Sequence, residues 1–283
     1  MIGFVGLGKM GGGLASNFFR KGQNVWVYDI RPDIVDKFVS LGAHASTLDD
    51  MAQACEVIFT SLPLPVDVED IILKRLLPAA GPGRTFIDVS TIDPKTARHV
   101  KDSLAKNGHL FLACPLGKGP AQAAEGVEPI FAGGEREVFD RYRSLLELVG
   151  SPVYYLGDVE QSTAFKLISN HIGMTNMAIL AEGLALGVQA GIDMSVLQQL
   201  LTDTGAMSHQ LKLRGPWILQ EDYSPRFSVD LTVKDLNLVM AMATEWGAPV
   251  PLGKSALGMF REVQEKGWGS MDTAAVYKIY RED

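Results

Sequence analysis

The sequence predicts an α/β domain with a doubly wound parallel sheet, followed by an all-α domain. Short β-branched runs alternate with amphipathic stretches in the first half, a pattern typical of βαβ units. A glycine-rich turn directly follows the first of these runs. From Asp158 onward no strand-like run recurs, and apolar residues fall at helical spacing. We therefore expect domains over residues 1–157 and 158–283.

The expected strands share short apolar, often β-branched runs. They are Ile2–Val5, Val25–Tyr28, Val57–Ser61, Thr85–Val89, His109–Cys114, Pro129–Ala132 and Val153–Leu156. Pro32 and Pro94 suit the first turns of two of the intervening helices. The second half predicts one long helix, from Glu160 to Gln189, that begins at the domain junction. Glycine and proline then divide the remainder into several shorter helices.

Composition limits the function classes. At 283 residues, 47% hydrophobic and 21% charged, the chain is globular and long enough for two cores. A net charge of −7 with scattered basic residues leaves no surface for nucleic acid. The two cysteines, Cys55 and Cys114, form no metal-ligand spacing, so we expect neither a disulfide nor a metal. No membrane segment is expected, and a cytoplasmic location fits best.

The glycine-rich turn is a dinucleotide fingerprint, Gly6-Leu7-Gly8-Lys9-Met10-Gly11, between a predicted strand and a predicted helix. It predicts a Rossmann-type domain in which helical N–H groups meet the pyrophosphate. Asp29 ends the second strand, where a carboxylate accepts hydrogen bonds from the ribose and repels a 2′-phosphate. NAD is therefore the expected cofactor, and nearby Arg31 keeps NADP possible. Asp29 could instead cap a helix.

Lys166 and Asn170 lie four positions apart on the long predicted helix, so both side chains project from one face. A lysine between Phe165 and Leu167 either reaches water along its stem or meets a partner in a cleft. Because the helix begins where the second domain should meet the nicotinamide end of the cofactor, Lys166 is the candidate proton-transferring group of a dehydrogenase.

Several motifs occur in a fixed order along the chain. They are the fingerprint with Ala15-Ser16-Asn17 and Gly22, then Leu62-Pro63, Asp88-Val89-Ser90-Thr91 with Pro94, Lys166 with Asn170, and Phe227 and Leu231 with Lys234-Asp235-Leu236. Together they resemble the 3-hydroxyisobutyrate dehydrogenase family, also called the β-hydroxyacid dehydrogenases, nearly end to end.

The resemblance implies roles for individual residues. Lys166 and Asn170 would form the catalytic pair, and Leu62, Pro63 and Thr91 would border the cofactor. Lys234 would also reach the active site, where we expect it among the cofactor-binding residues. Ser90 would contact the substrate. Ser90 and Thr91 could instead cap the helix near Pro94, and Lys234 could be a solvated lysine paired with nearby acids.

The substrate loop departs from the family pattern. The family usually has Ser-Gly-Gly here, whereas this chain reads Gly117-Lys118-Gly119. The pattern is closer to the branch that includes sulfolactaldehyde reductase, whose loop carries a glycine followed by a basic residue. We expect Lys118 and the loop amides to hold the anionic tail of the substrate, a carboxylate, sulfonate or phosphate. Lys118 could equally point to water.

The predicted reaction is therefore hydride exchange between NAD(H) and the hydroxyl or aldehyde carbon of a short 3-hydroxy acid or anionic semialdehyde. Its active site is expected in the cleft between the two domains. Two alternatives remain open: an imine reductase on the same scaffold, and a nucleotide-binding protein without catalysis. The long apolar helix and the resemblance both favour a homodimer or homotetramer.

Overall fold

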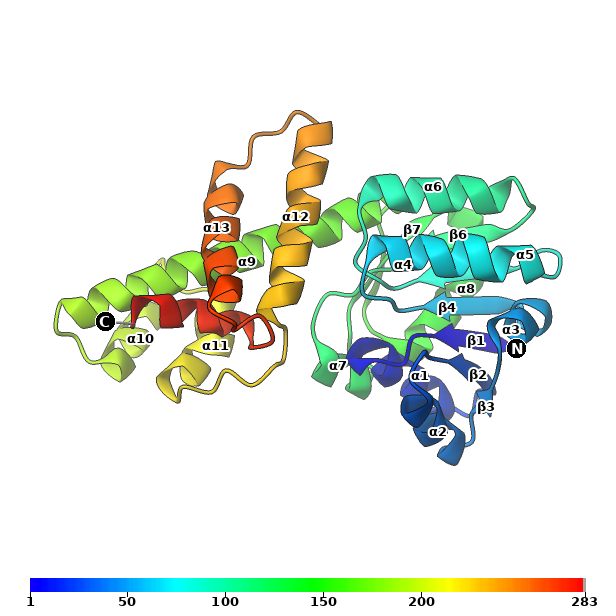
Figure 1. Ribbon diagram of the computed structural model, residues 1–283, viewed down its shortest axis with the longest axis horizontal. Helices are drawn as coiled ribbons and strands as arrows, with labels where there is room; N and C mark the ends of the chain where they lie inside the picture. The colour runs from blue at the N-terminus through cyan, green and yellow to red at the C-terminus, as the bar shows by residue number, and fades with distance from the viewer. Residues whose placement is uncertain (282–283) are drawn as a thin grey trace. The chain divides into compact units, whose positions relative to one another are not determined.

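The computed structural model describes residues 1–281 (Figure 1). The chain divides into two compact units, Met1–Lys166 and the residues from Leu167 onward. This division falls inside the long helix α9 (Val159–Gln189), whose first turns pack on the sheet of the first unit.

The first unit contains an eight-stranded sheet with the order β3-β2-β1-β4-β5-β6-β7-β8. Its strands are β1 (Ile2–Val5), β2 (Val25–Tyr28), β3 (His44–Ala45), β4 (Val57–Thr60), β5 (Thr85–Asp88), β6 (Leu110–Ala113), β7 (Ile130–Gly134) and β8 (Val153–Tyr155). The first six are parallel and follow the Rossmann order, which confirms the predicted fold class. β7 runs antiparallel to β6, which the sequence pattern did not predict.

Helices connect these strands. They are α1 (Lys9–Arg20), α2 (Pro32–Ser40), α3 (Leu48–Ala54), α4 (Pro65–Glu69), a π-helical segment η1 (Asp70–Leu76), α5 (Leu77–Ala79), α6 (Pro94–Ala105), α7 (Pro120–Glu125) and α8 (Arg136–Val149). Pro32 and Pro94 begin α2 and α6 as predicted. The cap of α6 is Asp93, whose side chain accepts the Thr96 amide at 2.9 Å, so neither Ser90 nor Thr91 caps this helix.

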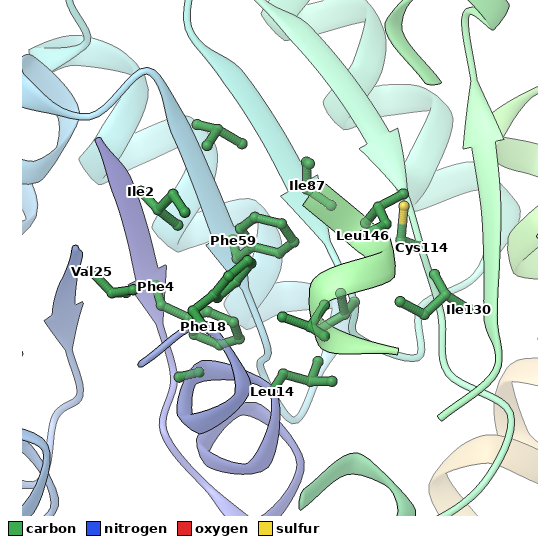
Figure 2. Close-up of a cluster of buried hydrophobic side chains, with 14 of the residues drawn as sticks. Ile2, Phe4, Leu14, Phe18, Val25, Phe59, Ile87, Cys114, Ile130 and Leu146 are labelled. Carbon is green, nitrogen blue, oxygen red and sulfur yellow. The ribbon is translucent and has the colours of Figure 1, made fainter. Parts of the chain in front are cut away.

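Apolar side chains fill both faces of the sheet, because neighbouring residues on a strand point to opposite sides. On one face, Phe4 of β1 stacks on Phe59 of β4 with ring centroids 5.7 Å apart. Phe18 of α1 meets Phe59 edge-on at 5.2 Å, and Leu14 packs in the same cluster (Figure 2). On the other face, Ile58 belongs to a separate cluster with α3, η1 and α6. This packing fixes α1, and with it the glycine-rich turn before it.

The second unit is helical, and no named strand follows β8 in the part of the chain that the structure describes. It contains most of α9, then α10 (Met194–Thr202), α11 (His209–Leu219), α12 (Val229–Glu245), α13 (Pro251–Glu265) and a 3-10 helix η2 (Thr273–Tyr280). α12 and α13 pack side by side (Figure 1), and Leu236 and Phe260 are buried between them and α9 in one core.

α9 is, among the described residues, the helix that is long and apolar enough by length and composition to cross a membrane. The same composition is found in core helices of soluble proteins. In α9, Met177 and Leu184 are fully buried in the helical core, and Lys166 and Glu182 interrupt the apolar run. Packing in this unit thus accounts for part of the apolar composition of α9, and other apolar side chains of the helix are exposed.

Candidate active site

The predicted cofactor residues of the first unit lie at the carboxyl ends of the parallel strands, which is where such sheets bind ligands, whereas Lys234 lies on α12 in the second unit. Gly6 follows β1 with φ of 89°, and a Cβ there would lie 2.2 Å from the Ser61 carbonyl oxygen. A Cβ on Gly11 would lie 2.0 Å from the Gly6 carbonyl oxygen. Both positions therefore require glycine, because any side chain there would collide with a backbone carbonyl oxygen.

Gly8 is different, since a Cβ at this position would meet no described atom within 4 Å. Gly8 precedes α1, whose first-turn amides follow at Lys9 and Met10. The open space beside Gly8 is where a pyrophosphate would approach these amides, so the turn fits a bound dinucleotide. Leu7, between the two glycines, is buried and anchors the turn.

Asp29 follows β2 and is held by two backbone amides. Its Oδ2 accepts the Leu7 amide at 2.7 Å, and its Oδ1 accepts the Arg31 amide at 2.9 Å. The Arg31 guanidinium donates to Asp33 at 2.7 Å, and this hydrogen bond raises the pKa of Arg31 and lowers that of Asp33. Asp29 is thus fixed beside the fingerprint, and Arg31 is paired with the acid that follows it.

A polar network joins the ends of β4 and β5. The Asp88 carboxylate accepts from Thr60 Oγ1 at 2.7 Å and from Ser90 Oγ at 2.6 Å. Ser90 Oγ also accepts the Leu62 amide at 2.9 Å. The Ser90 hydroxyl therefore holds the Leu62-Pro63 loop next to the start of the Ser90-Thr91 loop. The Ser90 oxygen can accept one more hydrogen bond, and this capacity is available to a ligand.

The substrate loop is tied to the start of β7. The Phe131 amide donates to Pro115 O at 3.0 Å, and the Gly117 amide donates to Pro129 O at 2.9 Å. The Lys118 amide donates to Oε1 of Glu128, a fully buried side chain. The amides of Gly117, Lys118 and Gly119 were predicted to bind an anion. Two of the three, those of Gly117 and Lys118, thus have acceptors within the protein.

Gly117 has a steric reason to lack a side chain. A Cβ there would lie 2.9 Å from the Phe131 ring and 3.1 Å from Pro129 Cβ. Phe131 in turn stacks with Tyr154 at 5.8 Å and meets Phe165 edge-on at 4.6 Å. This aromatic cluster occupies the space that a serine at position 117 would need.

Lys166 ends the first unit, on the first turns of α9. Ser162 Oγ, one turn earlier, donates to the Ala113 carbonyl at the end of β6 at 3.1 Å, which fixes the helix to the sheet. Lys166 is 8% exposed, so its charge is largely removed from water. Its position on α9 places Asn170 one turn further along the same helix.

In the second unit, Asp235 of α12 binds two predicted site residues. Asn170 Nδ2 donates to Asp235 Oδ2 at 2.6 Å, and Lys234 Nζ lies 2.8 Å from Asp235 Oδ1. Asp235 is 1% exposed. In the sequence, Asp235 stands out only as part of the Lys234-Asp235-Leu236 motif, and Glu128 belongs to no motif. The acid next to a lysine in this motif was the available signal for Asp235, and no pattern in the sequence indicated Glu128.

Thiols, possible metal ligands and a surface pocket are the other features of the chain that bear on chemistry. The thiols of Cys55 and Cys114 are buried, and burial raises the pKa of Cys55 to about 11. Over residues 1–281, no group of histidine, cysteine, aspartate or glutamate is arranged to hold a metal. A surface pocket between Trp26, His44 and Gln53 contains none of the predicted site residues.

Two family models match the chain. Residues 1–157 match the NAD-binding domain of 6-phosphogluconate dehydrogenase, and residues 161–280 match the NAD-binding model of NADP-dependent 3-hydroxyisobutyrate dehydrogenase. The chain belongs to the 3-hydroxyisobutyrate dehydrogenase family. It is an NAD(P)-dependent oxidoreductase of the β-hydroxyacid dehydrogenase class, as the sequence predicts.

Relatives within this family match nearly the whole chain. A 3-hydroxyisobutyrate dehydrogenase of Pseudomonas aeruginosa is 33% identical, over 99% of this chain and 98% of its own length. An L-threonate dehydrogenase of Cupriavidus necator is 31% identical, over 99% and 95%. The solved 3-hydroxyisobutyrate dehydrogenase of Mycobacterium tuberculosis, determined with L-serine, is 26% identical with a TM-score of 0.92, and covers 99% of both chains.

Solved imine reductases share the fold of this family member. One from a Pseudomonas species is 21% identical with a TM-score of 0.64, and one from Bacillus cereus is 23% identical with a TM-score of 0.66. At this identity the likeness concerns the fold alone. Several relatives that match at 30% or more are dehydrogenases of short hydroxy acids.

Proposed function

We propose that the protein transfers a hydride between NAD(H) and the hydroxyl or aldehyde carbon of a short acid, with Lys166 as the general acid/base. The observation that carries the proposal is a buried lysine one helical turn before Asn170, whose amide is itself anchored to Asp235. A lysine removed from water, on a helix fixed to the end of the sheet, suits proton transfer better than a solvated one.

The proposed substrate class rests on the activities of the relatives. They are dehydrogenases of 2-(hydroxymethyl)glutarate, L-threonate, L-serine and 3-hydroxyisobutyrate, and each of these substrates carries a carboxylate and a hydroxyl. In this chain we assign the anionic tail to the exposed ammonium of Lys118 with the Gly119 amide. The Gly117 and Lys118 amides contribute less, because they already have acceptors.

The chain's own groups would act as follows. The bound nicotinamide supplies or accepts the hydride. In reduction, the Lys166 ammonium would donate a hydrogen bond to the carbonyl oxygen and then its proton to the forming alkoxide. In oxidation, the neutral amine would take the hydroxyl proton. Asn170 would orient the same oxygen, and Asp235 would keep the Asn170 amide in place.

We propose NAD as the preferred cofactor. Asp29 is fixed next to the fingerprint by two amides, so its carboxylate stands where a ribose would lie and where a 2′-phosphate would be repelled. Arg31 is turned to Asp33, which removes the cation that an NADP-binding site would use. Leu62, Pro63, Thr91 and Lys234 complete the proposed cofactor contacts.

The test of Lys166 is steady-state kinetics combined with cofactor binding. Lys166→Ala is expected to lower kcat by about a hundredfold or more, the usual contribution of general acid–base catalysis, with NADH affinity retained. The substrates are three- and four-carbon semialdehydes carrying carboxylate, sulfonate or phosphate, and a cyclic imine tests the imine reductase alternative. Lys212→Ala, an exposed lysine in α11, is the control. Turnover within a few-fold of wild type in Lys166→Ala contradicts the assignment.

We also propose that the protein self-associates through α9, as a homodimer or homotetramer. Ile172, Ile179 and Leu186 lie seven positions apart, on one face of the helix, and are 55%, 58% and 65% exposed. Ile179→Asp is expected to give a monomer of 30.7 kDa in light scattering after size exclusion. Gln199→Glu, at an exposed position of α10, adds an equal charge away from this face of α9 and should not change the mass.

A further inference from the structure

Glu128 is a fully buried carboxylate next to the substrate loop. It precedes β7 and lies opposite the loop that follows β6. Its Oε1 accepts the Lys118 amide, whereas its Oε2 is buried and has no hydrogen-bond partner among the described residues. A buried carboxylate with an unmatched oxygen is costly, so its presence calls for a physical explanation.

One effect of Glu128 is to position the substrate loop. Leu116 and Ile130 form an isolated antiparallel bridge, flanked by the hydrogen bonds from Phe131 to Pro115 and from Gly117 to Pro129. The Lys118 amide lies between ladder positions and donates to the Glu128 side chain. The loop up to Lys118 is therefore held by three hydrogen bonds, and the last depends on Glu128.

A second effect of Glu128 is electrostatic. Burial raises the pKa of Glu128, and the hydrogen bond from the Lys118 amide and the charges of Lys166 and Lys118 act against this rise. Within the first unit these two lysines thus offset part of the cost of burying the Glu128 carboxylate. An anion bound at Lys118 would lie close to a fixed negative charge, and the repulsion would double for a dianion.

We propose that Glu128 is a positioning and specificity residue of the substrate site: its carboxylate holds the Gly117–Gly119 loop through the Lys118 amide and restricts the site to substrates with a singly charged tail. The inference rests on the proposed binding of an anionic tail at Lys118. Within that proposal it selects carboxylates and sulfonates over phosphates. Glu128 touches neither reacting atom and acts through the loop.

Two variants separate the two roles. Glu128→Gln keeps an acceptor for the Lys118 amide and removes the charge. Glu128→Leu removes both and fills the buried volume with an apolar side chain. Glu125→Gln, at the exposed end of α7, is the control for charge removal in the same segment.

The positioning role is read by hydrogen exchange of the peptide that contains residues 115–125, measured on the full chain. Wild type, Glu128→Gln and Glu125→Gln are expected to protect the Lys118 amide to the same extent, and Glu128→Leu to expose it. Equal protection in Glu128→Leu overturns this role. The readout needs no catalysis, so it stands even if the proposed reaction fails.

The specificity role is read by calorimetric binding of two small anions to the enzyme–NADH complex at pH 8.5. Methanesulfonate carries one charge and methylphosphonate carries two. Wild type is expected to bind methanesulfonate in preference, and Glu128→Gln to shift the ratio of the two dissociation constants toward methylphosphonate by about tenfold. An unchanged ratio in Glu128→Gln, or no binding of either anion to wild type, overturns the specificity role. If Lys166→Ala loses turnover while Glu128→Gln leaves the ratio of dissociation constants unchanged, the proposed reaction holds and this inference is wrong.

Discussion

Asn170 donates a hydrogen bond of 2.6 Å from Nδ2 to Oδ2 of Asp235, 65 positions further along the chain. The other oxygen of the same carboxylate lies 2.8 Å from Lys234 Nζ. One buried acid thus fixes the amide of Asn170 and neutralises Lys234. In the second unit, the side chains of Asn170 and Lys234, which both belong to the family motifs, therefore depend on the same carboxylate.

Asp235→Ala is expected to lower the free energy of unfolding by about 3 kcal/mol, because it removes a buried carboxylate that lies 2.8 Å from the ammonium of Lys234. Asp235→Asn should cost less, since an amide oxygen can still accept from Asn170. Urea denaturation of the full chain measures both. Glu265→Ala, at the exposed end of α13, is the control and should stay within about 0.5 kcal/mol of wild type. Equal losses for the two Asp235 variants would show that charge pairing alone matters.

Gly8→Ala should separate binding from stability. A Cβ at this position meets no described atom, so the melting temperature is expected to stay near that of wild type. The methyl group would, however, stand where the pyrophosphate must approach, and NADH affinity should fall by tenfold or more, about 1.4 kcal/mol. Fluorescence titration with NADH measures the affinity. Gly258→Ala, in the middle of α13 and also facing open space, should leave affinity unchanged. Unaltered NADH affinity in Gly8→Ala would contradict the proposed path of the cofactor.

Asp29→Ser combined with Asp33→Ala is expected to shift cofactor preference toward NADPH. The first change removes the carboxylate that repels the 2′-phosphate, and the second releases the Arg31 guanidinium to bind it. The ratio of kcat/KM for NADPH to that for NADH should rise about tenfold or more. Asp36→Ala, an exposed acid on α2, controls for the loss of surface charge. A ratio that does not move would exclude Asp29 as the determinant of preference.

Glu128→Gln should change how stability depends on pH. Because burial raises the pKa of Glu128, the unfolded chain ionises first as the pH rises, while the native state still holds its proton. Wild-type stability is therefore lost as the pH rises from the ordinary glutamate value through the raised one. The variant lacks this loss, so its advantage in free energy of unfolding should grow between pH 4 and pH 8. Urea unfolding across this range, with Glu125→Gln beside it, makes the measurement. A constant difference would show that Glu128 is not destabilised by burial.

Much of the architecture could be predicted from local patterns. Strands such as Ile2–Val5 and Val25–Tyr28 agree with β1 and β2 in their bounds, and α9 begins one residue before the predicted Glu160. β3 escaped prediction, because two residues cannot display an alternating pattern. The antiparallel direction of β7 also escaped it, because strand direction depends on pairing with β6 and not on the residues of β7.

The family, the dinucleotide fingerprint and the Lys166/Asn170 spacing could be predicted without a structure, because they depend on residues that are close together along the chain. Which polar groups already have partners became known only from the folded chain. It tied the Lys118 amide to Glu128 and the Asn170 amide to Asp235. It also set Phe131 against Gly117. These pairs lie on different strands, loops and helices, and their contacts exist only once the packing of each unit has brought those elements together.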